Sequence, residues 1–402
     1  MRSDNRIARP FWLGQLQRAW ESVPVVWLSG VRRVGKTTLA RELPGARFVN
    51  CDLPSTARLL EDPERFYASL ETGTVVFDEI HQLLDPSRVL KIAADEWPHL
   101  KVLATGSSTL AATQKFRDSL TGRKRSIHLL PVLHRELPAF GGSSLEKRLL
   151  LGGLPEALLA NSRDPAFYSE WLDSYFARDI QELFRVAKRR EFLKLVELVL
   201  RQSGGLLEIS SLAKHIGLAR PTVASYLEVL DVTHVSRSIR PFHRGSRREI
   251  LLQPKVYGFD TGFVSFANGW GEPHERELGL LFEHLVLDTL SVERGAESVF
   301  TWRDKDKREV DFVLPGPQGS CDTVECKWDP EAFSTKSLAA FRSLHPKGAN
   351  YLLSPQGGAP YVREVAGLEV VFTNLEGWES GEAQRLARRS QPETPAPYPP
   401  LR

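Results

Sequence analysis

Short apolar runs alternate with longer amphipathic stretches through the first third of the chain. The runs at residues 24–30 ("PVVWLSG"), 74–80 ("TVVFDEI") and 99–108 ("HLKVLATGSS") have the length and β-branched content of buried strands. Stretches with helical spacing, such as "TTLARELP" and "STARLLEDPERFYASL", lie between them. This alternation is typical of a parallel sheet covered by helices on both faces. We therefore predict an α/β core over residues 1–140.

The pattern changes three times after this core. Residues 141–190 predict a helical lid, and residues 191–260 show three helical stretches followed by short extended runs. Residues 261–378 contain the helical "GLLFEHLVLDTL", which starts at Gly279, and then become strand-rich, which predicts a second α/β domain. Residues 379–402 end in "QPETPAPYPPLR", and this Pro-rich composition predicts a disordered tail.

Two packed helices are predicted between residues 206 and 230. Pro221 suits the first turn of the second helix, where its missing N–H is not needed. The apolar positions that would pack the pair are Leu212, Ile216, Val223, Leu227 and Leu230. This is the helix-turn-helix pattern, and we expect Arg220, Thr222 and Ser225 on its second helix to face a DNA groove.

A basic hairpin is expected after this helix pair, at "RSIRPFHRGSRREILLQPKVY". Arg244, Arg247 and Arg248 at its tip would contact DNA phosphates, as the wing of a winged helix does. Residues 185–255 carry fourteen Lys and Arg against six Asp and Glu, a charge of +8 within a net charge of +3. Such a stretch predicts a nucleic-acid surface. The alternatives are a solvated helical surface and a winged helix used only for packing.

Composition narrows the class of protein. A chain of 402 residues with 42% hydrophobic and 26% charged residues is typical of a soluble protein of several domains. We find no apolar run of the roughly 18 to 20 residues that a membrane span needs, and no secretory signal. The three cysteines, Cys51, Cys321 and Cys326, form no metal or disulfide pattern. These features predict a cytoplasmic protein with no membrane partner.

The segment "GVRRVGKTT" matches a phosphate-binding loop and lies between a predicted strand and a predicted helix. Its backbone N–H groups would bind phosphates, Lys36 would reach the β and γ phosphates, and Thr37 would ligate Mg²⁺. ATP and Mg²⁺ are therefore the expected cofactors. The expected contacts are Gly30, Val31, Arg32, Arg33, Val34, Gly35, Lys36, Thr37 and Thr38.

Further candidates for ATP chemistry follow in the chain. Asp78 would bind Mg²⁺ and Glu79 would polarise the attacking water. Ser107 would contact the γ phosphate, although a Ser and Gly there would also suit a plain turn. Arg123 is the preferred arginine finger, with Arg178 as a weaker candidate, and the alternative for Arg123 is an ordinary surface arginine.

A second candidate site lies between Glu309 and Trp328. Side chains alternate along a strand, so Glu325 and Lys327 share one face while Cys326 points into the core. If the two strands pair, Asp311 joins them. Asp311 and Glu325 would then hold Mg²⁺, Lys327 would orient the attacking water, and Glu283 would add a third carboxylate. The alternatives are the polar side of a surface hairpin and a nuclease fold that has lost activity.

These motifs together resemble the prokaryotic AAA-type (AAA+) P-loop ATPases with a C-terminal domain of unknown function (DUF4143-type) related to PD-(D/E)xK nucleases. The resemblance rests on the order of many short matches, including "GVRRVGKTTLA", "VVFDEIH", "SLTGR", "LGGLPEAL", "YFARDI", "YGFDTGF" and "VECKW". It implies nucleotide contacts at Gly30, Gly35, Lys36, Thr37, Asp78 and Glu79, and a nuclease-type core at Glu283, Asp311, Glu325 and Lys327. His81 departs from the usual Gln, and we expect it to take no part in the chemistry.

The resulting expectation is an α/β protein made of an AAA+ core, a helical lid, a winged helix-turn-helix and a PD-(D/E)xK-like domain. Its expected function is ATP-driven processing or remodelling of duplex or branched DNA, with a Mg²⁺-dependent nuclease-like domain. A homo-oligomeric ring, such as a hexamer, would bring Arg123 to a neighbouring subunit's nucleotide. The alternative is a nucleotide-gated DNA-binding switch, or a junction-migrating motor, whose nuclease-like domain does not cleave. Regulation or phage defence would suit such a switch.

Overall fold

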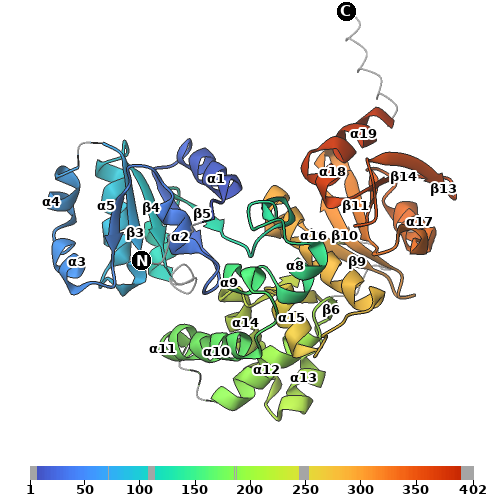
Figure 1. Ribbon diagram of the computed structural model, residues 1–402, viewed down its shortest axis with the longest axis horizontal. Helices are drawn as coiled ribbons and strands as arrows, with labels where there is room; N and C mark the ends of the chain where they lie inside the picture. The colour runs from blue at the N-terminus through green and yellow to red at the C-terminus, as the bar shows by residue number, and fades with distance from the viewer. Residues whose placement is uncertain are drawn as a thin grey trace, which may run out of the picture. The chain divides into compact units, whose positions relative to one another are not determined.

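The structure is a computed structural model that describes residues 7–70, 72–106, 114–184, 186, 188–243 and 253–390 (Figure 1). The chain divides into two compact units, numbered 1–238 with 256–271, and 239–255 with 272–402. Ser107, Arg244, Arg247 and Arg248 lie outside the described residues, so their expected roles stay predictions.

A five-stranded parallel sheet forms the centre of the first unit, in the order β2-β3-β4-β1-β5. Its strands are β1 (Val25–Ser29), β2 (Arg47–Asn50), β3 (Thr74–Asp78), β4 (Lys101–Thr105) and β5 (Lys124–His128). Strands β1, β3 and β4 confirm the three strands predicted from apolar runs. The short, polar sequences of β2 and β5 gave no such signal, because these strands lie at the edges of the sheet.

Helices cover this sheet. They are α1 (Pro10–Trp20), α2 (Lys36–Arg41), α3 (Pro54–Leu59), α4 (Pro63–Ala68), α5 (Pro86–Glu96) and α7 (Gln114–Ser119). Four of them begin with proline, whose fixed φ suits the first helical turn. In Figure 1, α1 and α2 lie on one side of the sheet and α4 and α5 on the other. Trp27, Phe77 and Leu90 belong to the core that α5 buries against the sheet.

The rest of the first unit is mainly helical. Its elements are α8 (Leu145–Leu151), α9 (Pro155–Leu159), α10 (Pro165–Tyr175), a π-helical turn (Phe176–Ile180), α11 (Gln181–Phe184), α12 (Arg189–Arg201), α13 (Ile209–Ile216), α14 (Arg220–Val232) and α15 (Thr261–Ala267). A small sheet in the order β6-β8-β7 joins β6 (Gly205–Leu206), β7 (Ser236–Ile239) and β8 (Lys255–Gly258). The predicted helix pair is present as α13 and α14. Its five expected apolar positions are all buried.

The second unit contains a six-stranded mixed sheet in the order β13-β14-β12-β11-β10-β9. Its strands are β9 (Phe300–Arg303), β10 (Glu309–Pro315), β11 (Cys321–Cys326), β12 (Asn350–Leu353), β13 (Tyr361–Val365) and β14 (Leu368–Thr373). Its helices are α16 (Glu275–Arg294), α17 (Thr335–Leu344), α18 (Leu375–Glu379) and α19 (Glu382–Ser390). Across the described ranges, no helix is both long and apolar enough to cross a membrane.

Helix α19 corrects part of the predicted disordered tail. Residues 382–390 are helical, and Ala383 and Ala387 on one face of that helix are buried. Composition alone missed this helix because its contact face consists of small alanines among charged residues. The Pro-rich residues 391–402 lie outside the described part of the chain.

Candidate functional site

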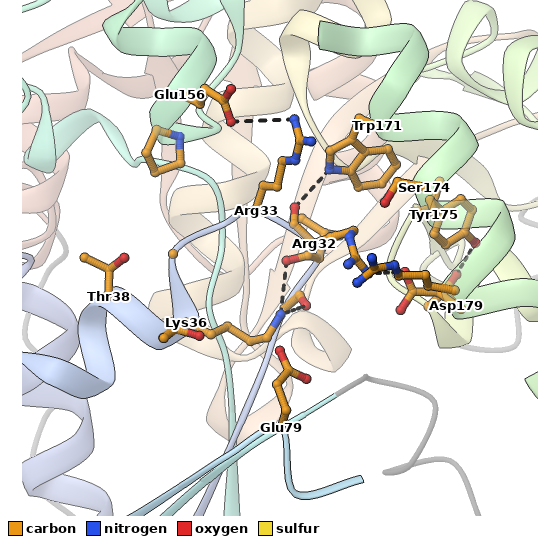
Figure 2. Close-up of a pocket in the computed structure, with 18 of the residues that line it drawn as sticks. Arg32, Arg33, Lys36, Thr38, Glu79, Glu156, Trp171, Ser174, Tyr175 and Asp179 are labelled. Carbon is orange, nitrogen blue, oxygen red and sulfur yellow. Dashed lines mark hydrogen bonds and ion pairs between the residues drawn. The ribbon is translucent and has the colours of Figure 1, made fainter. Parts of the chain in front are cut away.

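The phosphate-binding loop lies between the end of β1 and the start of α2. Gly30 and Gly35 both have positive φ, of 149° and 103°. A Cβ added at Gly30 would lie 2.7 Å from the Leu129 carbonyl oxygen, so only glycine fits there. Lys36 Nζ donates hydrogen bonds to the carbonyl oxygens of Gly30 (2.9 Å) and Val31 (3.3 Å), as Figure 2 shows. Burial lowers the Lys36 pKa, and the Glu79 carboxylate opposes that effect.

Asp78 ends β3 beside this loop, and it accepts hydrogen bonds from two hydroxyl groups. Thr37 Oγ1 lies 3.0 Å from Asp78 Oδ2, and Thr105 Oγ1 donates to Asp78 Oδ1 at 2.6 Å. A hydroxyl and a buried carboxylate are oxygen ligands of the kind that Mg²⁺ prefers, and Mg²⁺ commonly takes its remaining ligands from phosphates and water. The residues therefore fit Mg²⁺, which would be held by Thr37 and Asp78 and, when bound, would neutralise charge on the phosphates.

Glu79, the residue after Asp78, has a strained backbone conformation. Its φ of 56° lies in the left-handed region, which is unfavourable for a non-glycine residue. Its backbone N–H donates to Thr105 Oγ1 at 3.1 Å, which helps to hold this conformation. The carboxylate points toward Lys36 in Figure 2. His81 Nδ1 lies 3.3 Å from Glu79 Oε2, so His81, which we expected to stand apart from the chemistry, contacts the proposed general base.

A pocket of about 990 Å³ opens over the loop. The predicted contacts that line it are Gly30, Val31, Arg32, Arg33, Gly35, Lys36, Thr37, Thr38 and Glu79. Val34 is instead fully buried, and Asp78 is 5% exposed beside Thr37. Thr105, which accepts from the Glu79 N–H and donates to Asp78, was missed although it lies inside the predicted strand run and ends β4.

Helices α9 and α10 and the π-helical turn, within the predicted lid, form one wall of this pocket. Trp171 Nε1 donates to the Arg32 carbonyl oxygen at 2.9 Å, and Arg33 pairs with Glu156 at 3.6 Å (Figure 2). Arg32 pairs with Asp179 at 3.6 Å. Asp179 lies in the π-helical turn, a distortion that is frequent at functional sites.

A further wall comes from the turn between α14 and β7. Thr233 and Val235 both line the pocket. The hydroxyl groups of Thr233 and Tyr175 lie 2.6 Å apart. His234, between Thr233 and Val235 in sequence, packs against His128 with ring centroids 3.9 Å apart and ring planes tilted by 42°. Sequence reasoning missed this wall because its residues lie almost 200 positions from Lys36 and carry no motif.

The two arginine candidates have different surroundings. Arg178 lines the pocket. Arg123 does not, and its Nε donates to Asp95 Oδ1 at 2.6 Å on the surface. Of the two candidates, Arg178, which the sequence favoured less, is therefore the one that lines the pocket of the first unit. A role for Arg123 in a neighbouring subunit stays a prediction.

In the second unit, β10 and β11 pair in antiparallel fashion and bring Asp311, Glu325 and Lys327 together, as predicted. Lys327 Nζ lies 3.6 Å from Asp311 Oδ2 and 3.4 Å from Glu325 Oε2. Asp311 Oδ2 also accepts the Cys326 N–H at 2.9 Å. Asp311 is 8% exposed and Glu325 is 5% exposed. A pair of buried carboxylates is not the polar side of a surface hairpin.

Burial and neighbouring charges shift the pKa values of the two carboxylates in different directions. Burial opposes the ionisation of Asp311, but Lys327, Lys255 and hydrogen bonds with Cys326 and Glu325 together outweigh it and lower the Asp311 pKa. Burial, with the Asp311 charge added, raises the Glu325 pKa well above its usual range. Asp311 in turn raises the Lys327 pKa. Asp311 is therefore favoured in its ionised form beside a charged Lys327. Glu325, in contrast, is more easily protonated than an ordinary glutamate.

Glu283 does not complete this cluster as expected. Its Oε1 lies 2.7 Å from Lys255 Nζ, which also lies 2.7 Å from Glu309 Oε1. Within the residues that the structure describes, no three His, Cys, Asp or Glu side chains are placed to hold a metal ion. Glu325 Oε1 is buried without a hydrogen-bond partner there, so Asp311 and Glu325 fit a two-carboxylate Mg²⁺ site of the kind that a substrate phosphate completes.

The predicted DNA-facing residues lie on α14. Arg220 and Ser225 are exposed, and Thr222 is half-buried. These exposures suit a contact surface, while a DNA contact itself stays a prediction.

Residues 22–138 match an AAA domain family, residues 142–274 match a domain of unknown function (DUF8612), and residues 278–366 match another (DUF4143). Uncharacterised proteins of Mycobacterium bovis and Mycobacterium tuberculosis are each 27% identical over 314 residues, which cover 75% of this chain and 69% of each relative. The chain therefore carries an AAA domain followed by two domains of unknown function.

Solved structures show only a distant likeness. A Walker-type ATPase of Pyrococcus abyssi is 17% identical over 66% of this chain and 97% of that one, with a TM-score of 0.42. AMPPCP-bound DnaA from Aquifex aeolicus is 11% identical over 55% of this chain and 87% of that one, with a TM-score of 0.26. TM-scores this low support no conclusion about function.

Proposed function

We propose that this protein is an ATP-hydrolysing DNA-binding protein in which nucleotide binding is linked to DNA binding through α14. One observation carries the proposal. The pocket over the phosphate-binding loop is lined both by Lys36 and Thr37 and by Thr233 and Val235, at the end of α14. A nucleotide in the pocket would therefore contact the chain segment that ends the DNA-reading helix.

The residues around the loop have distinct roles in this proposal. Lys36 leaves its two carbonyl partners and binds the phosphates, while Thr37 and Asp78 hold Mg²⁺. Glu79 takes a proton from the attacking water. Its strained backbone, fixed by Thr105, directs the carboxylate toward Lys36.

DNA would lie along the exposed side of α14, against Arg220, Thr222 and Ser225. The wing arginines at positions 244, 247 and 248 would add phosphate contacts. Linkage is reciprocal, so DNA must change nucleotide affinity by the same factor by which nucleotide changes DNA affinity. The direction of the effect depends on which arrangement of α14 each ligand prefers.

Fluorescence anisotropy with labelled duplex, forked and four-way DNA tests this linkage, with and without a non-hydrolysable ATP analogue. We expect the analogue to change DNA affinity by about fivefold or more. Thr233→Val and Tyr175→Phe each remove the hydrogen bond at the pocket wall and should reduce this factor. Arg88→Ala, at an exposed position of α5 outside the basic stretch, is the control. Equal DNA affinity in the two nucleotide states would refute the linkage, and no DNA binding at all would refute the proposal.

A second candidate function is Mg²⁺-dependent DNA cleavage by the C-terminal domain. The convergence of Asp311, Glu325 and Lys327 supports it. Incubation with plasmid and four-way DNA in Mg²⁺ or Mn²⁺ should yield cut products that Asp311→Asn abolishes without changing ATP turnover. If the wild type cuts none of these DNAs, the domain has a binding role only.

We also infer a homo-oligomer, because Arg123 lies outside the pocket and would reach a nucleotide only from another copy. Analytical ultracentrifugation with the ATP analogue should show an assembly larger than a monomer. A monomer in every nucleotide state would exclude Arg123 as an arginine finger.

A further inference from the structure

Arg9 and Glu136 form a buried ion pair in the first unit. Their side chains are 4% and 3% exposed, and Arg9 Nε and Nη2 donate to the two Glu136 carboxylate oxygens at 2.8 Å each. Glu136 also accepts the Leu133 N–H at 3.0 Å and the Trp12 indole N–H at 3.2 Å. A buried ion pair adds little net stability compared with apolar residues of the same volume. Stability alone therefore does not account for this pair.

The remainder of the Arg9 guanidinium faces the phosphate-binding loop. Its Nη1 donates to the Val34 carbonyl oxygen at 3.1 Å, and its Nη2 also donates to the Leu130 carbonyl oxygen at 3.1 Å. The Arg9 backbone N–H donates to Glu42 Oε2 at 3.1 Å, at the end of α2. A Cβ added at Gly35 would lie 4.0 Å from Arg9 Nη1. Arg9 therefore contacts the loop directly, although it lies outside the loop motif in the sequence.

The peptide bond between Val34 and Gly35 converts this contact into a constraint on the loop. The bond is trans, so the Val34 carbonyl and the Gly35 N–H point in opposite directions. Because Arg9 holds the carbonyl oxygen, the Gly35 N–H points away from the guanidinium. Gly35 lines the pocket, and the backbone N–H groups of such a loop bind phosphate oxygens.

We propose that Arg9 is a positioning residue of the nucleotide site, which acts through the Val34 carbonyl to keep the Gly35 N–H directed at the phosphates. Glu136 in turn holds Arg9 in place. This inference deepens the proposed function and rests on its ATP-binding step. Without the guanidinium, the peptide unit can rotate, because glycine adopts many backbone conformations. Every ligand that carries the phosphates then binds more weakly, whether or not it carries a base.

A selective label makes the Gly35 N–H directly observable. Val34–Gly35 is the only Val-Gly dipeptide in the sequence. In full-length protein made with carbonyl-¹³C valine and ¹⁵N glycine, a carbonyl-to-amide NMR correlation therefore contains one signal, that of Gly35. We expect this signal to shift when the wild type binds Mg²⁺ with ADP, and also when it binds Mg²⁺ with pyrophosphate, which has no base.

The double variant Arg9→Met with Glu136→Gln removes the ion pair without leaving a buried charge unpaired. Its Gly35 signal should move in the nucleotide-free protein. Its affinities for ADP and pyrophosphate should each fall by about tenfold, the effect of one hydrogen bond to a charged group. The KM for ATP should rise to a similar extent while kcat changes by less than about threefold, because the N–H contacts ground state and transition state alike. Arg18→Met, at an exposed position of α1, is the matched control and should change none of these quantities.

Two results would overturn the inference and leave the ATP-binding proposal intact. One is a Gly35 signal in the wild type that does not respond to pyrophosphate although pyrophosphate binds. The other is a folded double variant with the wild-type Gly35 signal and the wild-type ADP affinity. Should the double variant fail to fold, Glu136→Gln alone decides, because it removes the ionic partner of Arg9 and should move the signal and weaken ADP binding. Wild-type protein that binds neither ADP nor pyrophosphate would refute ATP binding itself, and the inference with it.

Discussion

The two units use lysine and acidic residues in different ways. At the phosphate-binding loop, Lys36 bonds to the neutral carbonyl oxygens of Gly30 and Val31. In the C-terminal cluster, Lys255 and Lys327 bond to carboxylates. An ammonium that leaves neutral carbonyls for a phosphate exchanges one set of hydrogen bonds for a stronger set. An ammonium group that moves away from buried carboxylates leaves their negative charges unpaired, which is destabilising.

A lysine close to acidic residues is therefore not enough to define the kind of site. Both places contain a lysine near an acidic pair, yet only the first has a lysine ready to move to an incoming anion.

The largest effect is expected at Glu79. Glu79→Gln keeps the shape of the side chain but removes the base, so ATP turnover should fall by about 10²- to 10⁴-fold. ATP affinity should change little, because the loop contacts remain. Turnover and affinity are measured separately, by phosphate release and by titration with a fluorescent ATP analogue. Turnover near the wild-type rate would remove Glu79 from catalysis.

A pH-dependent effect on stability is expected at the wall of the loop pocket. Burial lowers the pKa of His234 to about 4. The unfolded chain, with an ordinary histidine pKa near 6.5, therefore binds the proton more readily, and stability falls as the pH drops from about 6.5 to 4. This histidine should account for roughly 3 kcal/mol of that loss.

His234→Asn tests this by urea unfolding between pH 7 and pH 4.5. Asparagine tolerates the φ of 61° found at this position, so the backbone need not change. The variant should lose less stability on acidification than the wild type. Identical pH profiles would mean that His234 has the same pKa in the folded and the unfolded chain.

Lys36→Ala tests the proposal that Lys36 leaves its two carbonyl partners and binds the phosphates of ATP. Loss of a charged hydrogen-bond donor to phosphate should weaken ATP binding by roughly 10- to 100-fold. Lys327→Ala, in the other unit, should leave ATP binding unchanged. Isothermal titration calorimetry measures both, and a similar loss in the two variants would contradict the assignment of separate sites.

The smallest effect is expected on α14. Arg220→Ala should reduce the slope of log DNA affinity against log salt by about one, because one phosphate contact and its released counterion are lost. Binding to different DNA sequences should weaken uniformly if the contact is to phosphate. An unchanged slope would place the DNA surface elsewhere, and Arg88→Ala on α5 provides the comparison.

Much of the loop site could be predicted because its parts are adjacent in the chain. A strand, a glycine-containing loop and a helix in direct succession place Lys36 and Thr37 by local geometry. Asp78 ends β3, which belongs to the same parallel sheet and is separated from β1 by β4. Asp311, Glu325 and Lys327 could be predicted to meet because strand alternation and one hairpin pairing are enough.

Only the tertiary structure decided which charges face each other across longer separations. Lys255 meets Glu283 and Glu309 from positions 28 and 54 residues away. Thr233 reaches the nucleotide pocket from the end of α14, and Arg178 rather than Arg123 lines it. Local sequence sets the direction of a side chain within its own helix or strand. Its partner across the fold depends on how separate elements pack, which no short motif encodes.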